Sequence, residues 1–134
     1  MASAPSYAVT PVAWTGLVPS TNDTSWTAPT HVTTLGTATS SGGSTGTKIT
    51  QVDVIDAGTE SAGLVNLFLY DGTNYHLHES VTIAAATPST TVAPIKTSLY
   101  YDNLVVPAGW SLVCSTTVVA DESLIEVNAF GAAL

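Results

Sequence analysis

Basic residues are almost missing from this chain. Lys48 and Lys96 are the only two among 134 residues, and the formal net charge is −8. Proteins that grip nucleic acid neutralise several phosphates with a patch of Lys and Arg, and adhesion to anionic lipid needs a similar cluster. Two lysines supply neither patch, so we predict that neither nucleic acid nor a membrane is a partner. Self-association of such acidic chains would have to use apolar or hydroxyl-rich contacts.

Charged residues of either sign are scarce. They make up 9% of the chain, against roughly 25% in an ordinary soluble domain, while hydrophobic residues make up 45%. Disordered chains show the reverse composition. The 14 Ser and 22 Thr residues fill the gap. Because Thr and Val fit a pleated surface and lose entropy in a helix, this composition predicts an all-β protein, and the length predicts one domain.

Cysteine occurs once, as Cys114, so an internal disulfide is excluded. The thiol lies within WSLVCST, which has strand spacing, and we expect it to be buried and structural rather than reactive. The first residues, MASAPSYAV, lack the basic and apolar segments of a secretory signal. No apolar run approaches the roughly 18 to 20 residues of a membrane span. We therefore expect a soluble protein that is made in a cytoplasm.

Residues 1–30 differ from the rest, because they hold four of the seven prolines and two of the three tryptophans. Proline suits edge strands and extended arms more than central strands. Yet this segment is too apolar for a free tail. We predict an extended N-terminal segment, 1–30, followed by a β-sandwich domain, 31–134. The segment packs either on its own domain or on a neighbouring subunit, and its candidate interface residues are Tyr7, Trp14, Val18 and Trp26.

Strand patterns separated by Gly, Pro and Asx turns recur from residue 31 onward, after a Gly- and Ser-rich loop at 37–47 is set aside. Their spacing of about ten residues predicts a jelly-roll-like antiparallel sandwich of about eight strands. The run 64–70 is apolar on both faces, which predicts a central strand covered on both sides. The expected strands are 31–36, 48–56, 64–70, 75–84, 98–106, 110–119 and 124–134.

His76 and His78 are the strongest hint of metal chemistry. Residues i and i+2 of a strand project to one side, so both imidazoles could touch one ion. A further ligand is lacking, and no CxxC, HExxH or DxDxDG pattern occurs. We predict a solvent-facing pair and no metal. The expected faces of this strand are Tyr75, Leu77, Val81 and Ile83 on one side, and His76, His78, Ser80 and Thr82 on the other.

Cupins, a jelly-roll family rich in metalloenzymes, offer a partial resemblance. Gly72 with His76 and His78 resembles the first cupin motif, and 107–109 (Pro-Ala-Gly) resembles the start of the second. However, Leu112 stands where the second motif has its His, and no Glu follows His78 at the right distance. No metal site is therefore carried over.

Other catalytic patterns are also missing. No glycine-flanked nucleophile elbow and no glycine-rich phosphate loop occurs. We predict no catalytic residues, no metal and no cofactor. The Asp121–Glu122 pair is best explained as a solvated turn, with calcium binding as the alternative. An exposed aromatic row that stacks on sugars is a further alternative, built from Tyr70, Tyr75, Tyr100, Tyr101 and Trp110.

Within 48–134, the stretches AGLVNLFLYDGTNYHL, ATPSTTVAP, NLVVPAGWSLVCST and EVNAFG resemble small structural proteins of tailed bacteriophages. Some of these resemble capsid decoration, or cement, proteins with a jelly-roll core. The resemblance implies a non-enzymatic virion protein on the head surface that binds the lattice of the major capsid protein and forms a homotrimer. We expect the copies to associate through outward faces of strands such as 64–70. The alternative is a tail or baseplate component, or a carbohydrate-binding receptor module.

Overall fold

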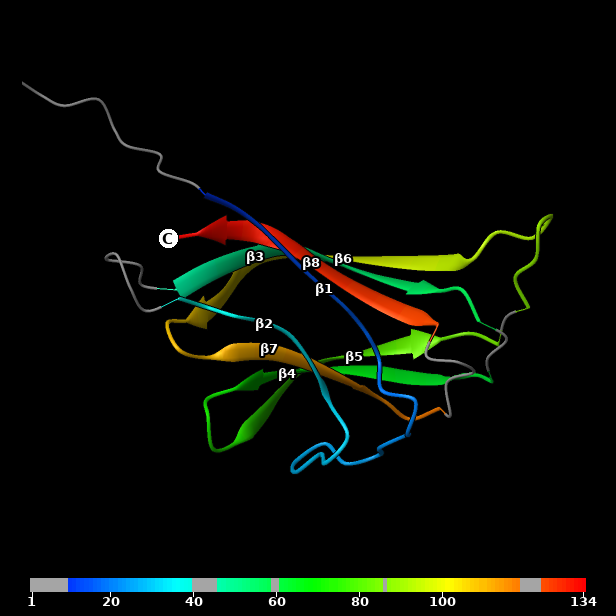
Figure 1. The fold of residues 1–134 in the computed structure, drawn as a ribbon, viewed down its shortest axis with the longest axis horizontal. Helices are drawn as coiled ribbons and strands as arrows, with labels where there is room; N and C mark the ends of the chain where they lie inside the picture. The colour runs from blue at the N-terminus through cyan, green and yellow to red at the C-terminus, as the bar shows by residue number, and fades with distance from the viewer. Residues whose placement is uncertain (1–9, 40–45, 59–60, 86, 119–123) are drawn as a thin grey trace, which may run out of the picture.

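The part of the chain that the structure describes forms eight β-strands (Figure 1). A computed structural model describes residues 10–39, 46–58, 61–85, 87–118 and 124–134. No helix occurs in these ranges, and so none that could cross a membrane. The strands are β1 (Thr10–Leu17), β2 (Thr33–Thr37), β3 (Gly46–Asp56), β4 (Gly63–Tyr70), β5 (Tyr75–Ile83), β6 (Ile95–Pro107), β7 (Ser111–Thr116) and β8 (Ile125–Ala133).

The strands form two four-stranded antiparallel sheets that pack face to face. Sheet A has the order β1-β8-β3-β6, and sheet B has the order β2-β7-β4-β5. Only β4 and β5 follow one another within a sheet; every other connection crosses between the sheets. This is the strand order of a jelly roll. The predicted all-β sandwich of about eight strands is therefore confirmed.

The core lies between the sheets and follows the period of two that strands impose. Val52 and Val54 of β3 face Val65 and Leu67 of β4 across the sandwich interior, and all four are buried. Cys114 of β7 lies in the same core, and burial raises the pKa of its thiol to about 12. The prediction of a buried structural thiol is confirmed.

Strand β4 is central and covered on both faces, as its sequence predicts. It lies between β7 and β5, with Val65 and Leu67 in the core. Asn66 and Phe68 point to the opposite face, yet both are fully buried. Figure 1 shows why: the segment 18–32, between β1 and β2, runs along the outer side of sheet B. The N-terminal part of the chain therefore forms a partial third layer.

Residues 10–17 form a strand of the sandwich itself. All eight pair with β8, and the Val18 amide extends the ladder by donating to the Ile125 carbonyl at 2.9 Å. Strand β1 is the edge of sheet A, a position where the missing N–H of Pro11 leaves no ladder bond unmade. The sequence leaves open whether this segment packs on its own domain or on a neighbour. For residues 10–18, the structure shows packing on the protein's own domain.

Trp14 closes the sandwich where the edge strands β1 and β2 meet. Its half-buried indole packs against the core and covers Gly36 of β2, where an added Cβ would overlap the ring. Nearby, the Thr33 hydroxyl donates to the Leu17 carbonyl at 2.7 Å. The two sheets can therefore approach each other at Gly36 because glycine has no side chain.

Candidate functional site

The prediction of a solvent-facing pair holds for His76, whose side chain is 51% exposed, and fails for His78, which is half-buried where β5 contains a bulge. Leu67 pairs with Glu79 and Phe68 pairs with Leu77, which leaves His78 as the extra residue. A one-residue bulge moves the side chains of the strand residues that precede it to the opposite face of the sheet. Tyr75 and Leu77 therefore lie on the outer face, away from Val81 and Ile83. The predicted grouping of these four side chains on one face is wrong.

Both imidazoles also contact aromatic rings along the edge between the sheets. His76 stacks on Trp110 with ring centroids 5.7 Å apart, and His78 lies 5.1 Å from the ring of Tyr101. Tyr101 belongs to β6 of sheet A, so the His78 contact bridges the two sheets. Burial, and next the negative charge of Glu79, raise the pKa of Tyr101 to about 12. The Tyr101 phenol is therefore neutral at ordinary pH. The two histidine–aromatic contacts along this edge are packing contacts.

Asp71 fixes the hairpin beside this edge. Its Oδ1 accepts the backbone N–H groups of Asn74 at 2.7 Å and Thr73 at 2.8 Å, and its Oδ2 lies 2.9 Å from His76 Nε2. The Asn74 bond, followed by those of His76 and Thr73, lowers the pKa of Asp71 to about 2. Gly72 takes a φ of 100° in the turn, a conformation that glycine adopts without strain. The Asp71–His76 contact therefore orders a turn.

Metal binding finds no ligand set in the described ranges. Nowhere in them do three His, Cys, Asp or Glu side chains come together as a metal would require. Leu112, which stands at the expected ligand position of the second cupin motif, is buried in the core. Asp121 and Glu122, the calcium alternative, lie outside the described residues.

The four predicted interface residues fall in different environments. Tyr7 lies outside the described residues. Trp14 is half-buried at the β1–β2 edge, and Val18 is 1% exposed within the protein's own core, which leaves it no surface for a neighbour. Trp26 is 53% exposed. Among the three of these residues that the structure describes, Trp26 is the most exposed.

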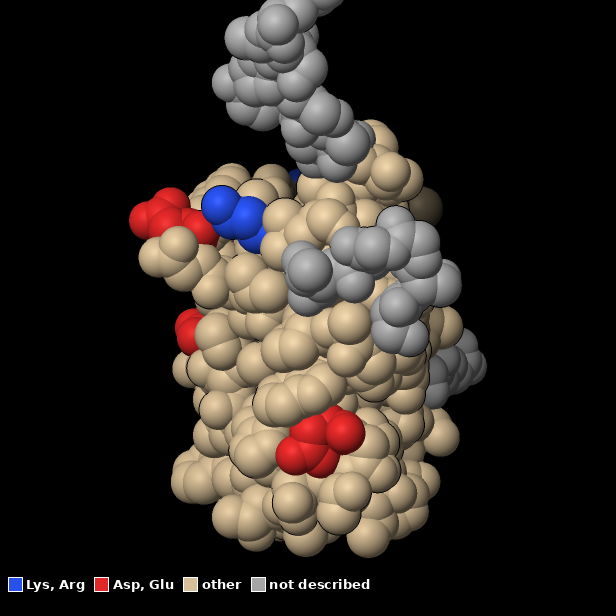
Figure 2. Space-filling view, turned by 90° about the vertical axis from the view of Figure 1, so that its left-hand side faces the viewer, with Lys and Arg blue, Asp and Glu red and all other residues tan. Residues whose placement is uncertain are grey.

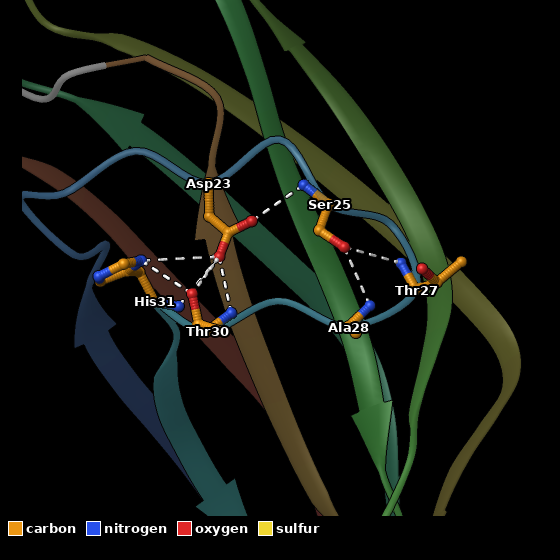
Figure 3. Close-up of polar contacts among 6 residues, drawn as sticks. All are labelled: Asp23, Ser25, Thr27, Ala28, Thr30 and His31. Carbon is orange, nitrogen blue, oxygen red and sulfur yellow. Dashed lines mark hydrogen bonds and ion pairs between the residues drawn. The ribbon is translucent and has the colours of Figure 1, made fainter.

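The segment 18–32, which carries Trp26, is organised around Asp23 (Figure 3). One carboxylate oxygen accepts the Ser25 N–H at 2.9 Å, and the other accepts the N–H groups of Thr30 at 2.7 Å and His31 at 3.0 Å. These bonds, above all the one from Ser25, lower the pKa of Asp23 to about 2 despite some desolvation. A single ionised side chain therefore ties both ends of the loop together.

Segment 18–32 also covers the middle of the outer face of 64–70 (Figure 1). Asn66 and Phe68 on that face are 0% exposed, and the Trp26 indole N–H donates to Asn66 Oδ1 at 3.3 Å. The expectation that copies associate through the outward face of 64–70 is therefore wrong, because the protein's own chain occupies it. The exposed sheet surface lies on the other side of the sandwich.

The outer face of sheet A, which we call the sheet-A face, consists of the outward side chains of β1, β8, β3 and β6. It stays open to solvent, since Tyr100 is 74% exposed and Phe130 37%. A depression of about 450 Å³ lies on it beside the edge strand, lined largely by Pro11, Ala13, Phe130 and Ala132. The sequence does not predict the sheet-A face, because the apolar residues of this face are scattered over four strands. Its exposed large side chains are Leu17, Tyr100, Val105 and Phe130.

Charges on the sheet-A face cancel. Both basic residues of the chain, Lys48 and Lys96, occupy outward positions there, and so do the acids Asp53 and Glu126. Lys96 Nζ lies 3.4 Å from Asp53 Oδ2. Burial opposes ionisation of Asp53, but hydrogen bonds from Gln51 and Ser98 and the Lys96 contact outweigh it and lower the pKa. The excess negative charge of the chain is therefore carried elsewhere.

One end of the molecule is also sparsely charged. Figure 2 shows isolated acidic and basic side chains on an otherwise uncharged surface.

The aromatic residues that are predicted as a possible sugar-stacking row do not form one surface. Tyr70 and Tyr75 stack on each other with centroids 4.3 Å apart, Tyr101 and Trp110 face the histidines, and Tyr100 points out from sheet A.

Comparison with known proteins adds no relative. No family model, no curated protein and no solved structure matches this chain.

Proposed function

We propose that this protein is a non-enzymatic structural component of a tailed-phage particle, a head decoration protein that binds the assembled lattice of the major capsid protein. The observation that carries this proposal is the asymmetry of the two sheets. Segment 18–32 covers Asn66 and Phe68 on the outer face of β4 in sheet B, whereas the sheet-A face exposes Tyr100 and Phe130 and carries ion-paired Lys96 and Asp53. An apolar, neutral face on a chain of net charge −8 is suited to contact with another protein.

The physical role follows from mass action. A protein that binds the assembled lattice more tightly than loose subunits stabilises the lattice by a free energy that rises with the logarithm of its free concentration relative to its Kd. A rigid jelly roll supplies a surface whose shape changes little on binding, so little ordering entropy is lost. Association into homotrimers at lattice junctions would repeat the same contact and raise its strength through multivalency.

Add-back to particles assembled without the protein tests this function. We expect wild-type protein to bind these shells and to raise the temperature at which they release DNA. The double variant Tyr100→Ser, Phe130→Ser should bind at least tenfold more weakly, because it removes the two largest exposed rings of the sheet-A face. Val92→Ser is the matched control, since Val92 is 53% exposed on a loop outside that face.

Two results would contradict the proposal. Shells that lose DNA at the same temperature with and without saturating protein would exclude the stabilising role. Equal binding by the double variant and by Val92→Ser, with both shown to be folded by circular dichroism, would exclude the sheet-A face as the contact surface.

A further inference from the structure

Trp26 is a large aromatic side chain that the fold holds out in solvent. Trp14 and Trp110 are half-buried against the core, whereas Trp26 is 53% exposed. The indole N–H donates to Asn66 Oδ1 at 3.3 Å, and Asn66 itself is 0% exposed. The ring is therefore tethered by its polar edge to sheet B while its apolar area faces outward.

The loop that carries Trp26 is ordered before any partner arrives (Figure 3). Asp23 accepts backbone N–H groups from both arms of the loop, and the Ser25 hydroxyl accepts the Ala28 N–H at 3.0 Å. The Asp23 amide in turn donates to the Thr116 carbonyl of β7 at 2.8 Å. Since the loop is already fixed to the sheet, a partner that takes up Trp26 would pay little ordering entropy.

We propose that Trp26 is an anchor that inserts into an apolar pocket on a protein partner, with Asp23 as the residue that positions it. Tryptophan is enriched among the few side chains that dominate binding energy at protein interfaces. A rigidly presented, half-exposed indole with its N–H already satisfied can enter such a pocket without leaving a buried donor unpaired. Under the function proposed above, on which this step rests, the partner is the capsid lattice.

A protein pocket fits this site better than a sugar does. Sugar recognition needs polar groups beside the stacking ring to hold the hydroxyls. Here the two acceptors at the base of the loop are occupied internally: the Asp23 carboxylate by backbone N–H groups, and Asn66 Oδ1 by Trp26 itself and by the Ser80 hydroxyl. The ring therefore offers apolar area without those acceptors.

Trp26 and the sheet-A face lie on opposite sides of the molecule. Segment 18–32 lies on the outer side of sheet B, and the sheet-A face lies on the opposite side of the sandwich (Figure 1). A subunit with an apolar contact on each side can touch two lattice neighbours at once. Bridging of this kind would help to hold adjacent capsid subunits together.

The test compares binding of Trp26→Ser, Trp26→Phe and Asp23→Ala with wild type on shells assembled without the protein. We expect Trp26→Ser to lower the affinity about thirtyfold and Trp26→Phe to lower it less. Asp23→Ala should weaken binding severalfold with the indole still present, and acrylamide should quench Trp26 more easily in that variant. Val92→Ser should bind like wild type. Thermal melts establish that each variant is folded.

Three other results would each contradict a specific part of this proposal. Wild-type affinity in folded Trp26→Ser, while wild type binds shells, excludes the anchor and leaves the proposed function standing. Shells that bind no wild-type protein exclude the proposed function and, with it, the partner assigned to Trp26. Reproducible glycan-array binding that is lost in Trp26→Ser overturns the choice of a protein pocket in favour of a sugar.

Discussion

At the scale of single residues, the best-defined side chain is an acid that serves structure. Asp23 receives three backbone N–H groups and the Thr30 hydroxyl, and these bonds hold its pKa near 2. In the sequence it stands in an ordinary turn-forming run, SerThrAsnAsp. Nothing in that run shows that its partners lie seven and eight residues further on, so its role could not be predicted from the sequence.

Replacement of Asp23 should cost stability in a pH-dependent way. Because folding lowers this pKa, the ionised carboxylate stabilises the folded state fully above its ordinary value of about 4. We expect Asp23→Ala to lower the free energy of unfolding by about 2 kcal/mol at pH 7. The difference from wild type should shrink as the pH falls from about 4 to about 2. Urea titrations across this range measure it.

Asp102→Ala is the control for this experiment, because Asp102 is an exposed acid with no hydrogen bond to a loop backbone among those described. Its stability should differ little from wild type at every pH. A gap between Asp23→Ala and wild type that persists unchanged at pH 2 would show that the carboxylate charge is not what stabilises the loop.

At the scale of elements, the sequence predicts the strands well and their irregularities poorly. Strands β3, β4, β5 and β8 match the expected ranges to within about two residues at each end, because each is a run of strand-forming residues bounded by turn signals. The bulge at His78 has no signature in YHLHESVTIA, yet it decides which face the histidines occupy. Strand β1 is hidden by Pro11 and Pro19, which suggest an arm; only its pairing with a strand far along the chain reveals an edge strand.

The closure between β1 and β2 gives a prediction for Gly36. An alanine there would overlap the Trp14 ring, so the ring or the strand must shift. We expect Gly36→Ala to destabilise the protein by about 1–3 kcal/mol. In a Trp14→Leu background the same change should cost clearly less, because the obstructing ring is gone. Thermal or chemical denaturation of the four proteins in this cycle measures the coupling.

Thr34→Ala, an exposed position on the same strand, is the matched control and should have little effect. Equal costs of Gly36→Ala with and without the Trp14 ring would contradict the proposed contact between the two edge strands.

At the scale of the whole molecule, the two sheets are protected unequally. Sheet B has the core on one side and segment 18–32 over β4 on the other, while sheet A has solvent on its outer side. The doubly apolar run 64–70 allows this cover to be predicted for one strand. The sequence does not say which segment supplies the cover, because that depends on where β1 enters sheet A.

Amide hydrogen exchange should reveal this inequality. We expect the amides of Leu67, Phe68 and Val113 in sheet B to exchange more slowly than those of Val52 and Val127, the central positions of sheet A. Asp23→Ala should speed exchange in β4 and β7 and leave β3 and β8 nearly unchanged. Uniform protection of the four central strands would contradict the picture of a third layer over sheet B.

The pairing of β1 with β8 has a consequence for how the protein is made. The first strand leaves the ribosome early, but its partner is synthesised more than a hundred residues later. At about 5–20 residues per second, β1 waits on the order of ten seconds for β8. During that delay Trp14 and Val18 cannot be buried in a completed core. The nascent chain therefore exposes apolar side chains that a chaperone can bind.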